Sequence, residues 1–149
     1  MSLLKKIRSR LEGGREAAPE THAENVRLAT AALLVETMRA DFEASEVERE
    51  TLTSLLERYF GLTASEADEL VDDAERAADK SVSLYDFTRV LNDSLAPGEK
   101  LDLVEMLWRA CLADGRLDKY EDYLVGKLAE LLHVQRAEVI RLRNTVREG

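Results

Sequence analysis

Apolar residues recur at the spacing of an α-helix along almost the whole chain, and this periodicity restricts the fold more than any other feature. Within segments 52–59 and 67–78 they fall three or four residues apart, which places them on one side of a helix. No stretch alternates between apolar and polar residues for long enough to indicate a β-strand. Only two of the 149 residues are proline and seven are glycine, the residues least compatible with a helix interior. The sequence therefore predicts an all-α fold.

Local signals divide the chain into about seven to eight helices. Thr21 is followed three residues later by a glutamate, which is the pattern of a capping box, so a helix is expected to begin there. Ser45 starts the same pattern, and Pro97 suits the first turn of a later helix. The expected helices cover about residues 2–12, 21–41, 45–60, 63–80, 83–94, 97–113, 118–132 and 136–147.

The beginning of the chain carries a charge opposite to that of the rest. Residues 1–15 have a local charge of +4 within a total of −9, which leaves −13 for the remainder. Apolar residues from Leu3 to Leu11 lie on one face of a short basic helix, so this leader is expected to make peripheral contact with an anionic membrane or a partner. Docking on the protein's own acidic body, or no fixed structure, are the alternatives. "EGGREAAPE" reads as a linker, so residues 1–20 form leader and linker and residues 21–149 form a single helical domain, with halves of about 21–80 and 83–149.

Charge and cysteine content narrow the classes of function. A net charge of −9 argues against nucleic-acid binding, which depends on neutralising phosphates with Lys and Arg. No apolar run approaches the roughly 20 residues of a membrane span, and the start lacks the features of a secretory signal. The single cysteine, Cys111, suits a reducing compartment. We expect a cytoplasmic protein, with a peripheral position at the inner face of the membrane as the alternative that the leader suggests.

The two halves of the domain resemble each other. At an offset of 73 residues, Asp41 falls on Asp114 and Glu48 on Glu121, and apolar positions of the following helices also coincide. After a slip of one residue the match continues, with Leu70 on Leu142. Each half thus reads as an apolar helix, an Asp, a turn, a Glu in the first turn of the next helix, and a third helix. The sequence predicts a bundle with an internal pseudo-twofold repeat, in which the two broad apolar helices pack together and the two hinges meet.

The second hinge carries a recognisable motif, in the segment "LVEMLWRACLADGRLDKYEDYLVGKLAELLHV". This segment resembles the TerB family of tellurite-resistance-associated proteins, which also occurs as a domain in a membrane-bound J-domain co-chaperone. The residues that match the family motif are Ala113, Asp114, Gly115, Leu117 and Glu121. The first half matches less well, because Phe42 stands in place of the glycine and Ala44 in place of a larger apolar residue. The resemblance spans about residues 25–147 and implies a role in the response to tellurite, metal or oxidative stress, through protein partners.

Four carboxylates at the two hinges are the candidate metal ligands. If the hinges pack together, these side chains would repel one another unless they were protonated or bridged by a cation. Carboxylates, backbone carbonyls and waters are the ligands that calcium prefers, and magnesium is the alternative. The family resemblance also implies metal at these positions. The four predicted ligands are Asp41, Glu48, Asp114 and Glu121.

Helix capping explains the same acids without a ligand. Glu48 and Glu121 stand where a capping box places its glutamate, and Asp114 can accept hydrogen bonds from its own turn. An EF-hand is excluded, because counting from Asp114 puts Arg116 at its third position and Val125 at its twelfth. Zinc is not expected either. The two histidines, His22 and His133, are isolated, and the cysteine lies on an apolar stripe.

No catalytic arrangement stands out. The chain has no Ser/His/Asp set, no Cys/His pair and no phosphate-binding glycine loop. Trp108 is expected in the core, and His133 at the end of a helix. We therefore expect a non-enzymatic module that binds a divalent cation and protein partners, in an oligomeric state that stays open. The alternative is a metal-free interaction module or membrane-peripheral scaffold whose acids are helix caps.

Overall fold

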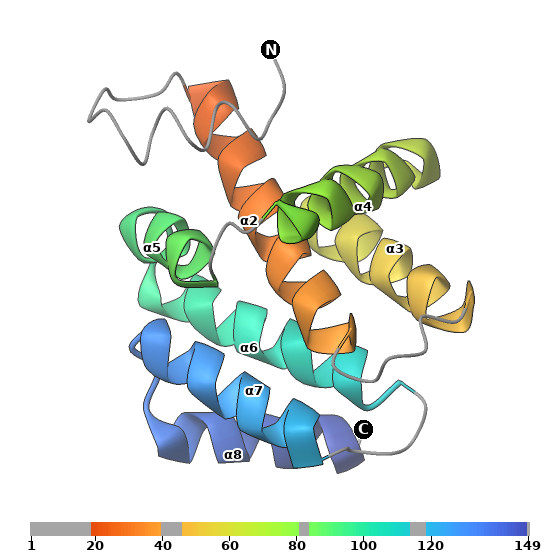
Figure 1. Cartoon of the computed structure of the whole chain (residues 1–149). Coiled ribbons are helices and arrows are strands. Elements are labelled where there is room, and N and C mark those ends of the chain that lie inside the picture. The colour runs from red at the N-terminus through yellow and green to blue at the C-terminus, as the bar shows by residue number, and fades with distance from the viewer. Residues whose placement is uncertain (1–18, 40–45, 81–83, 114–118, 149) are drawn as a thin grey trace.

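The computed structural model describes residues 19–39, 46–80, 84–113 and 119–148, and the regular structure in these ranges is entirely helical (Figure 1). The all-α prediction is confirmed. The expected leader helix over 2–12 lies outside the described residues. The helices are α2 (Pro19–Arg39), α3 (Glu46–Phe60), α4 (Ala64–Asp79), α5 (Leu84–Ser94), α6 (Pro97–Cys111), α7 (Lys119–Leu131) and α8 (Arg136–Glu148).

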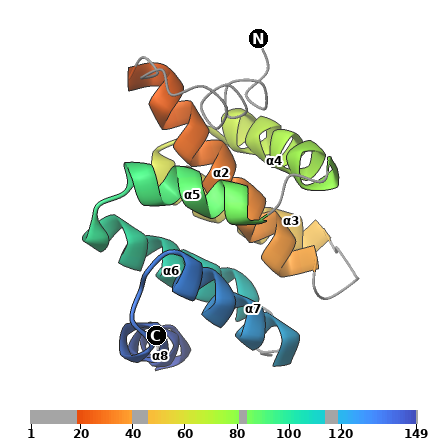
Figure 2. The same ribbon diagram turned by 60° about the vertical axis from the view of Figure 1, so that its left-hand side comes forward.

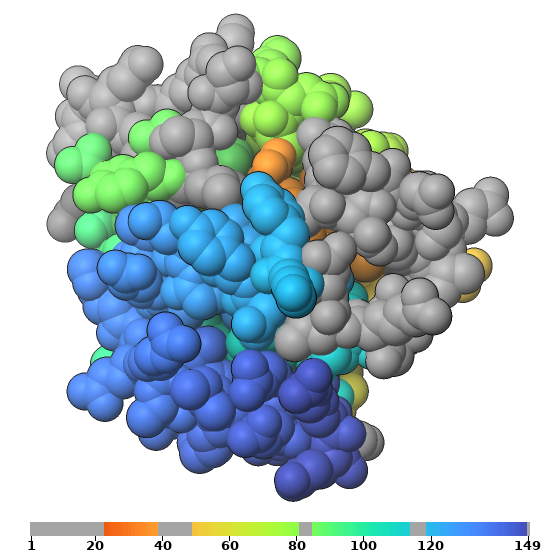
Figure 3. All heavy atoms as spheres, turned by 60° about the horizontal axis from the view of Figure 1, so that its bottom comes forward, coloured from red at the N-terminus to blue at the C-terminus, as the bar shows by residue number. Residues whose placement is uncertain are grey.

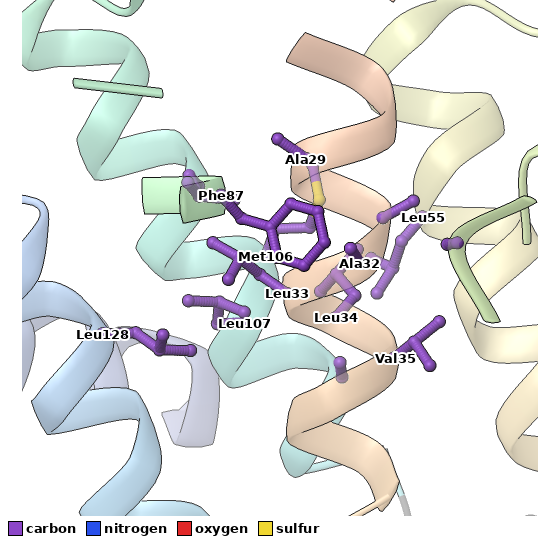
Figure 4. Close-up of a cluster of buried hydrophobic side chains, with 14 of the residues drawn as sticks. Ala29, Ala32, Leu33, Leu34, Val35, Leu55, Phe87, Met106, Leu107 and Leu128 are labelled. Atoms are coloured by element: carbon purple, nitrogen blue, oxygen red, sulfur yellow. The ribbon is translucent and has the colours of Figure 1, made fainter. Parts of the chain in front are cut away.

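Helix α2 is the centre of the bundle. Every residue from Leu28 to Val35 is buried, so this helix has no solvent-facing side over two turns. It packs against α4 and α5 and also contacts α3, α6 and α7 (Figures 1 and 2). Figure 4 shows Phe87 of α5 and Leu107 of α6 beside it, with Leu128 of α7 close by. The breadth of the apolar pattern in this segment predicted such burial on several sides.

One helix start differs from the prediction. Helix α2 begins at Pro19, two residues before Thr21, so Thr21 lies inside the first turn and is not the N-cap. Proline is favoured at this position because its ring fixes φ near the helical value and its missing N–H is not needed there. Pro97 occupies the same favoured place in α6, as predicted.

The packing follows the internal repeat. In each half the first helix contacts both others and contacts the third most extensively: α2 with α4, and α6 with α8. The first helices of the two halves, α2 and α6, also contact each other, as predicted from their broad apolar faces. Helix α5 lies at the start of the second half, before the three helices that match the first half, and it packs on α2 and α7.

The turns between the second and third helices are equivalent in the two halves. Gly61 ends α3 with φ 65°, and His133 ends α7 with φ 62°. These residues are 72 apart, the offset that the sequence repeat has after its one-residue slip. In both turns the next residue donates its N–H to a carbonyl five residues back, as in a Schellman motif. The two bonds are Leu62 N to Glu57 O at 3.2 Å and Val134 N to Ala129 O at 2.9 Å. His133 thus stands at a helix end, as predicted.

Two residues on α6 were expected in the core, and both are there. Trp108 is 2 % exposed, and its indole N–H donates to the Val139 carbonyl at 3.0 Å, which ties α6 to α8. Cys111 is buried. Over the described part of the chain, no helix combines the length and apolarity needed to cross a membrane.

Candidate cation site at the two hinges

The four predicted ligands differ in how far the structure describes them. Asp41 lies in segment 40–45 and Asp114 in segment 114–118, and both segments are outside the described residues. Glu48 is in the first turn of α3, but its side chain is not among those described. Glu121 is described fully. The separations among the four carboxylates therefore stay a prediction.

Glu121 is buried in the first turn of α7. It is 6 % exposed and is the one charged residue of the buried class among the described residues. A buried carboxylate is costly unless other groups engage it, and Glu121 does have an interaction partner within the protein. Its place at the start of α7 is favourable, because unpaired backbone N–H groups there stabilise negative charge.

Three of the four helix ends that flank the two hinges lie close together. The C-terminal ends of α2 and α6 and the start of α7 are close together in Figure 1 and again in Figure 2. Helix α7 contacts α2, and Figure 3 shows the start of α7 directly beside it. The start of α3, which carries Glu48, lies apart from them at the right-hand edge of Figure 1.

The acids of α4 are held by an arginine of α3. Arg49 Nη2 lies 2.8 Å from Asp68 Oδ1 and 2.8 Å from Asp72 Oδ1, and Nη1 lies 3.4 Å from Glu75 Oε1. Hydrogen bonds to Asp68 and then Asp72 raise the pKa of Arg49 above its ordinary value. One guanidinium therefore offsets part of the charge of these three acids.

Other metal sites find no support in the described ranges. No three or more His, Cys, Asp or Glu side chains come together there in a way that could hold a metal ion. Cys111 is buried on α6.

Sequence reasoning missed a groove between α7 and α8. It has a volume of about 910 Å³, and its lining includes Lys119, Tyr123 and Lys127 of α7 and Ile140 and Arg143 of α8. Such a groove arises only when two helices pack side by side, so one helix's pattern does not reveal it. The available signals were a glycine in the middle of α7 and apolar residues outside the buried stripes.

Comparison with known protein families gives a match. The model of the family described as "Tellurite resistance protein TerB" matches residues 27–144, which include α3 to α7 in full. Neither a curated protein nor a solved structure matches the chain.

Proposed function

The chain belongs to the TerB family of tellurite resistance proteins, and on this premise we propose that it is a non-enzymatic module that binds one divalent cation at its two hinges. Calcium is the first candidate and magnesium the second. Through protein partners, the module acts in the response to tellurite, metal or oxidative stress. The proposed ligands are Asp41, Glu48, Asp114 and Glu121.

The burial of Glu121 is the observation that most supports this proposal. A carboxylate is rarely enclosed unless a cation or several donors compensate for its lost hydration. The internal repeat supplies Glu48 at the equivalent place in α3, in the first turn of a helix that also follows a hinge. Calcium takes about 6–8 oxygen ligands, which the two hinges together can offer as carboxylates and backbone carbonyls.

A cation at this position would connect the two halves of the domain. Helices α2 and α6 contact each other, and their C-terminal ends lead into the hinges (Figure 1). Binding would relieve repulsion among the carboxylates and hold the ends of α2 and α6 and the start of α7 together. The surface near the hinges would then present a fixed shape to a partner only in the loaded form.

Thermal unfolding of the chelator-treated protein with and without calcium tests the proposal. A ligand at 100 times its dissociation constant adds about 2.7 kcal/mol to the free energy of unfolding, or about 5–10 °C in Tm for a domain of this size. Asp114→Asn and Glu121→Gln should each abolish the gain. Glu130→Gln removes an exposed carboxylate elsewhere on α7 and is the matched control, which should keep the gain. Titration calorimetry should give one cation per chain.

The alternative is a metal-free interaction module whose acids only cap helices. Glu121 is the third residue of α7, the position of the glutamate in a capping box. Glu66 shows this arrangement in α4, where its carboxylate accepts the backbone N–H of Thr63 at 2.9 Å. On this alternative Glu121→Gln, which keeps a side chain that a capping box accepts, changes stability equally with calcium and with chelator, and no cation shifts the wild-type Tm.

The basic leader is proposed to bring this module to an anionic membrane surface at the cytoplasmic face. Its apolar residues from Leu3 to Leu11, with the basic side chains around them, support this role. Cosedimentation with anionic liposomes should be stronger for the full chain than for residues 20–149. Equal sedimentation of the two would remove the membrane role and leave the leader to a protein contact.

A further inference from the structure

Helices α7 and α8 enclose a groove that the cation proposal does not use, named here the α7/α8 groove. The α7 residues that line it follow one stripe of that helix at intervals of three or four, and α8 forms the other wall. The α7 stripe consists of Lys119, Asp122, Tyr123, Gly126, Lys127 and Glu130. From its first to its last residue this stripe extends about 16 Å, because a helix rises about 1.5 Å per residue. The groove therefore matches the length of a helix of about three turns.

The walls of the groove are basic, although the whole chain has a charge of −9. Four cationic side chains line it against two carboxylates, Asp122 and Glu130. The cations are Lys119, Lys127, Arg136 and Arg143. Within the described part of the chain, only Arg143 among these four forms an ion pair, with its Nη1 3.4 Å from Asp122 Oδ1. The Nε of Arg143 is buried and has no hydrogen-bond partner there. That nitrogen is enclosed, so an acidic ligand would pair instead with Lys119, Lys127 and Arg136, for which the described residues provide no ion pair.

Large apolar side chains stand exposed on both walls. Tyr123 is 65 % exposed on α7, and Ile140 is 38 % exposed on α8. They flank buried Trp108 and Val139, which also line the groove. Apolar groups exposed around a concave surface are typical of a binding groove.

Gly126 lines the groove without a side chain, which leaves room for the backbone of a bound chain. It lies in the middle of α7, and a Cβ added to it would meet no atom within 4 Å, so packing inside this protein does not require glycine. Glycine is among the poorest helix formers. The equivalent position in the first half, at an offset of 73, is Thr53, so the glycine is peculiar to the half that has the groove. A glycine without an internal reason allows close approach by another chain.

From these observations we propose that the α7/α8 groove docks an acidic amphipathic helix of a partner protein. Its apolar side chains would lie between Tyr123 and Ile140, its backbone would approach Gly126, and its carboxylates would meet the lysines and arginines of the walls. This mode is the helix-in-groove recognition that many signalling proteins use. A flat lipid surface does not fit a groove whose lining includes the buried Trp108 and Val139. The inference rests on the partner-binding part of the proposed function and is independent of the cation.

A displayed library of 16-residue helical peptides tests the proposal. Apolar residues are fixed at positions i, i+3, i+4 and i+7, and the other positions vary among Glu, Asp, Lys, Arg and Gln. Selection on the full chain should enrich acidic peptides, and Trp108, the only tryptophan, should report their binding by fluorescence. Affinity should fall as salt rises, since the exposed ion pairs are screened. Enrichment of basic peptides, or no enrichment, overturns the proposal.

Two glycine variants locate the binding. Gly126→Gln fills the groove, and it should weaken the selected peptide by about tenfold or more, the loss expected for blocking the centre of an interface. Gly98→Gln is the matched control, because Gly98 is also an exposed helical glycine whose added Cβ meets no atom within 4 Å. It should leave the affinity within about twofold of wild type. Equal binding by both variants overturns the proposal.

Further measurements distinguish a partner helix from other occupants of the groove, and the groove proposal from the cation proposal. If the chain self-associates in sedimentation and Gly126→Gln abolishes this, the groove belongs to a second copy and the partner-helix proposal is wrong. Lipid binding that Gly126→Gln abolishes, without peptide binding, is equally contrary to it. Peptide selection is run in calcium and in chelator. If no acidic peptide is selected in either condition, the groove proposal alone is overturned. If calcium does not raise the Tm of the wild type, the cation proposal alone is overturned.

Discussion

Substitutions at the two left-handed turns should change the free energy of unfolding in opposite directions. Gly61 and His133 occupy equivalent positions with φ 65° and 62°, but only one of them is glycine. Gly61→Ala introduces a Cβ into a conformation that suits glycine, and His133→Gly removes one. We therefore expect the first variant to be less stable than wild type and the second to be more stable.

The magnitude follows from backbone strain alone. A Cβ at Gly61 would meet no atom within 4 Å, so there is no clash to add. An L-residue in the left-handed region costs about 1–2 kcal/mol, and alanine recovers about 0.4–1 kcal/mol by restricting the unfolded chain. Gly61→Ala should therefore lower the free energy of unfolding by about 1 kcal/mol, and His133→Gly should raise it by a similar amount. His133→Ala, which keeps a Cβ, should change it by less than about 0.5 kcal/mol.

Urea unfolding followed by Trp108 fluorescence measures these differences, with the slope m expected to be unchanged. In a thermal melt, each kcal/mol corresponds to about 2–4 °C for a domain of about 150 residues. A Gly61→Ala variant as stable as wild type would refute the strain argument. So would a His133→Gly variant that loses 1 kcal/mol or more, because its side chain would then contribute more than its backbone conformation costs.

Three further perturbations test the packing and the charges. Leu107→Ala, at a fully buried position of α6, should cost about 2–5 kcal/mol in urea unfolding, and a cost below 1 kcal/mol would contradict the observed core. Arg49→Met leaves Asp68, Asp72 and Glu75 without their shared guanidinium. The free energy of unfolding should fall by about 1 kcal/mol at low salt, because exposed ion pairs contribute little each. Most of this loss should vanish in 1 M salt, where the Debye length is about 3 Å. Hydrogen bonds from the backbone N–H of Thr63, and then from its hydroxyl, lower the pKa of Glu66. The ionised carboxylate therefore stabilises the fold above the pKa of the unfolded chain. This stabilisation is lost as the pH falls through the lower pKa of the folded protein. Glu66→Gln should therefore be less stable than wild type at pH 7 and equal to it in acid, and a pH-independent difference would be contrary to this linkage.

The sequence by itself determined the helices and most of their ends. Helix α8, expected over 136–147, runs from Arg136 to Glu148, and α7, expected over 118–132, runs from Lys119 to Leu131. These boundaries depend on capping residues, glycine and proline, which act on the backbone within a few residues. The exception at Thr21 is also local, because Pro19, which the sequence analysis placed in the linker, occupies the first position of α2.

The candidate site was predictable only in part. Repetition of an Asp and a Glu at one offset singled out Glu121, and its place in the first turn of α7 agrees with that pattern. Its burial could not be read from the sequence, because a glutamate at a helix start is as readily exposed as enclosed. Neighbouring helices decide that, and Asp41 and Asp114 lie outside the described residues.

The α7/α8 groove was decided by tertiary structure alone. Tyr123 and Gly126 are ordinary residues of one helix, and Ile140 of another, until the turn at His133 brings the two helices together. Periodicity states which face of a helix is apolar, but a groove depends on the distance and direction between two faces. Helix ends follow from short-range hydrogen bonding and backbone preference, and so the sequence contains them. Grooves and buried charges follow from how separate helices pack, and only the folded chain fixes that.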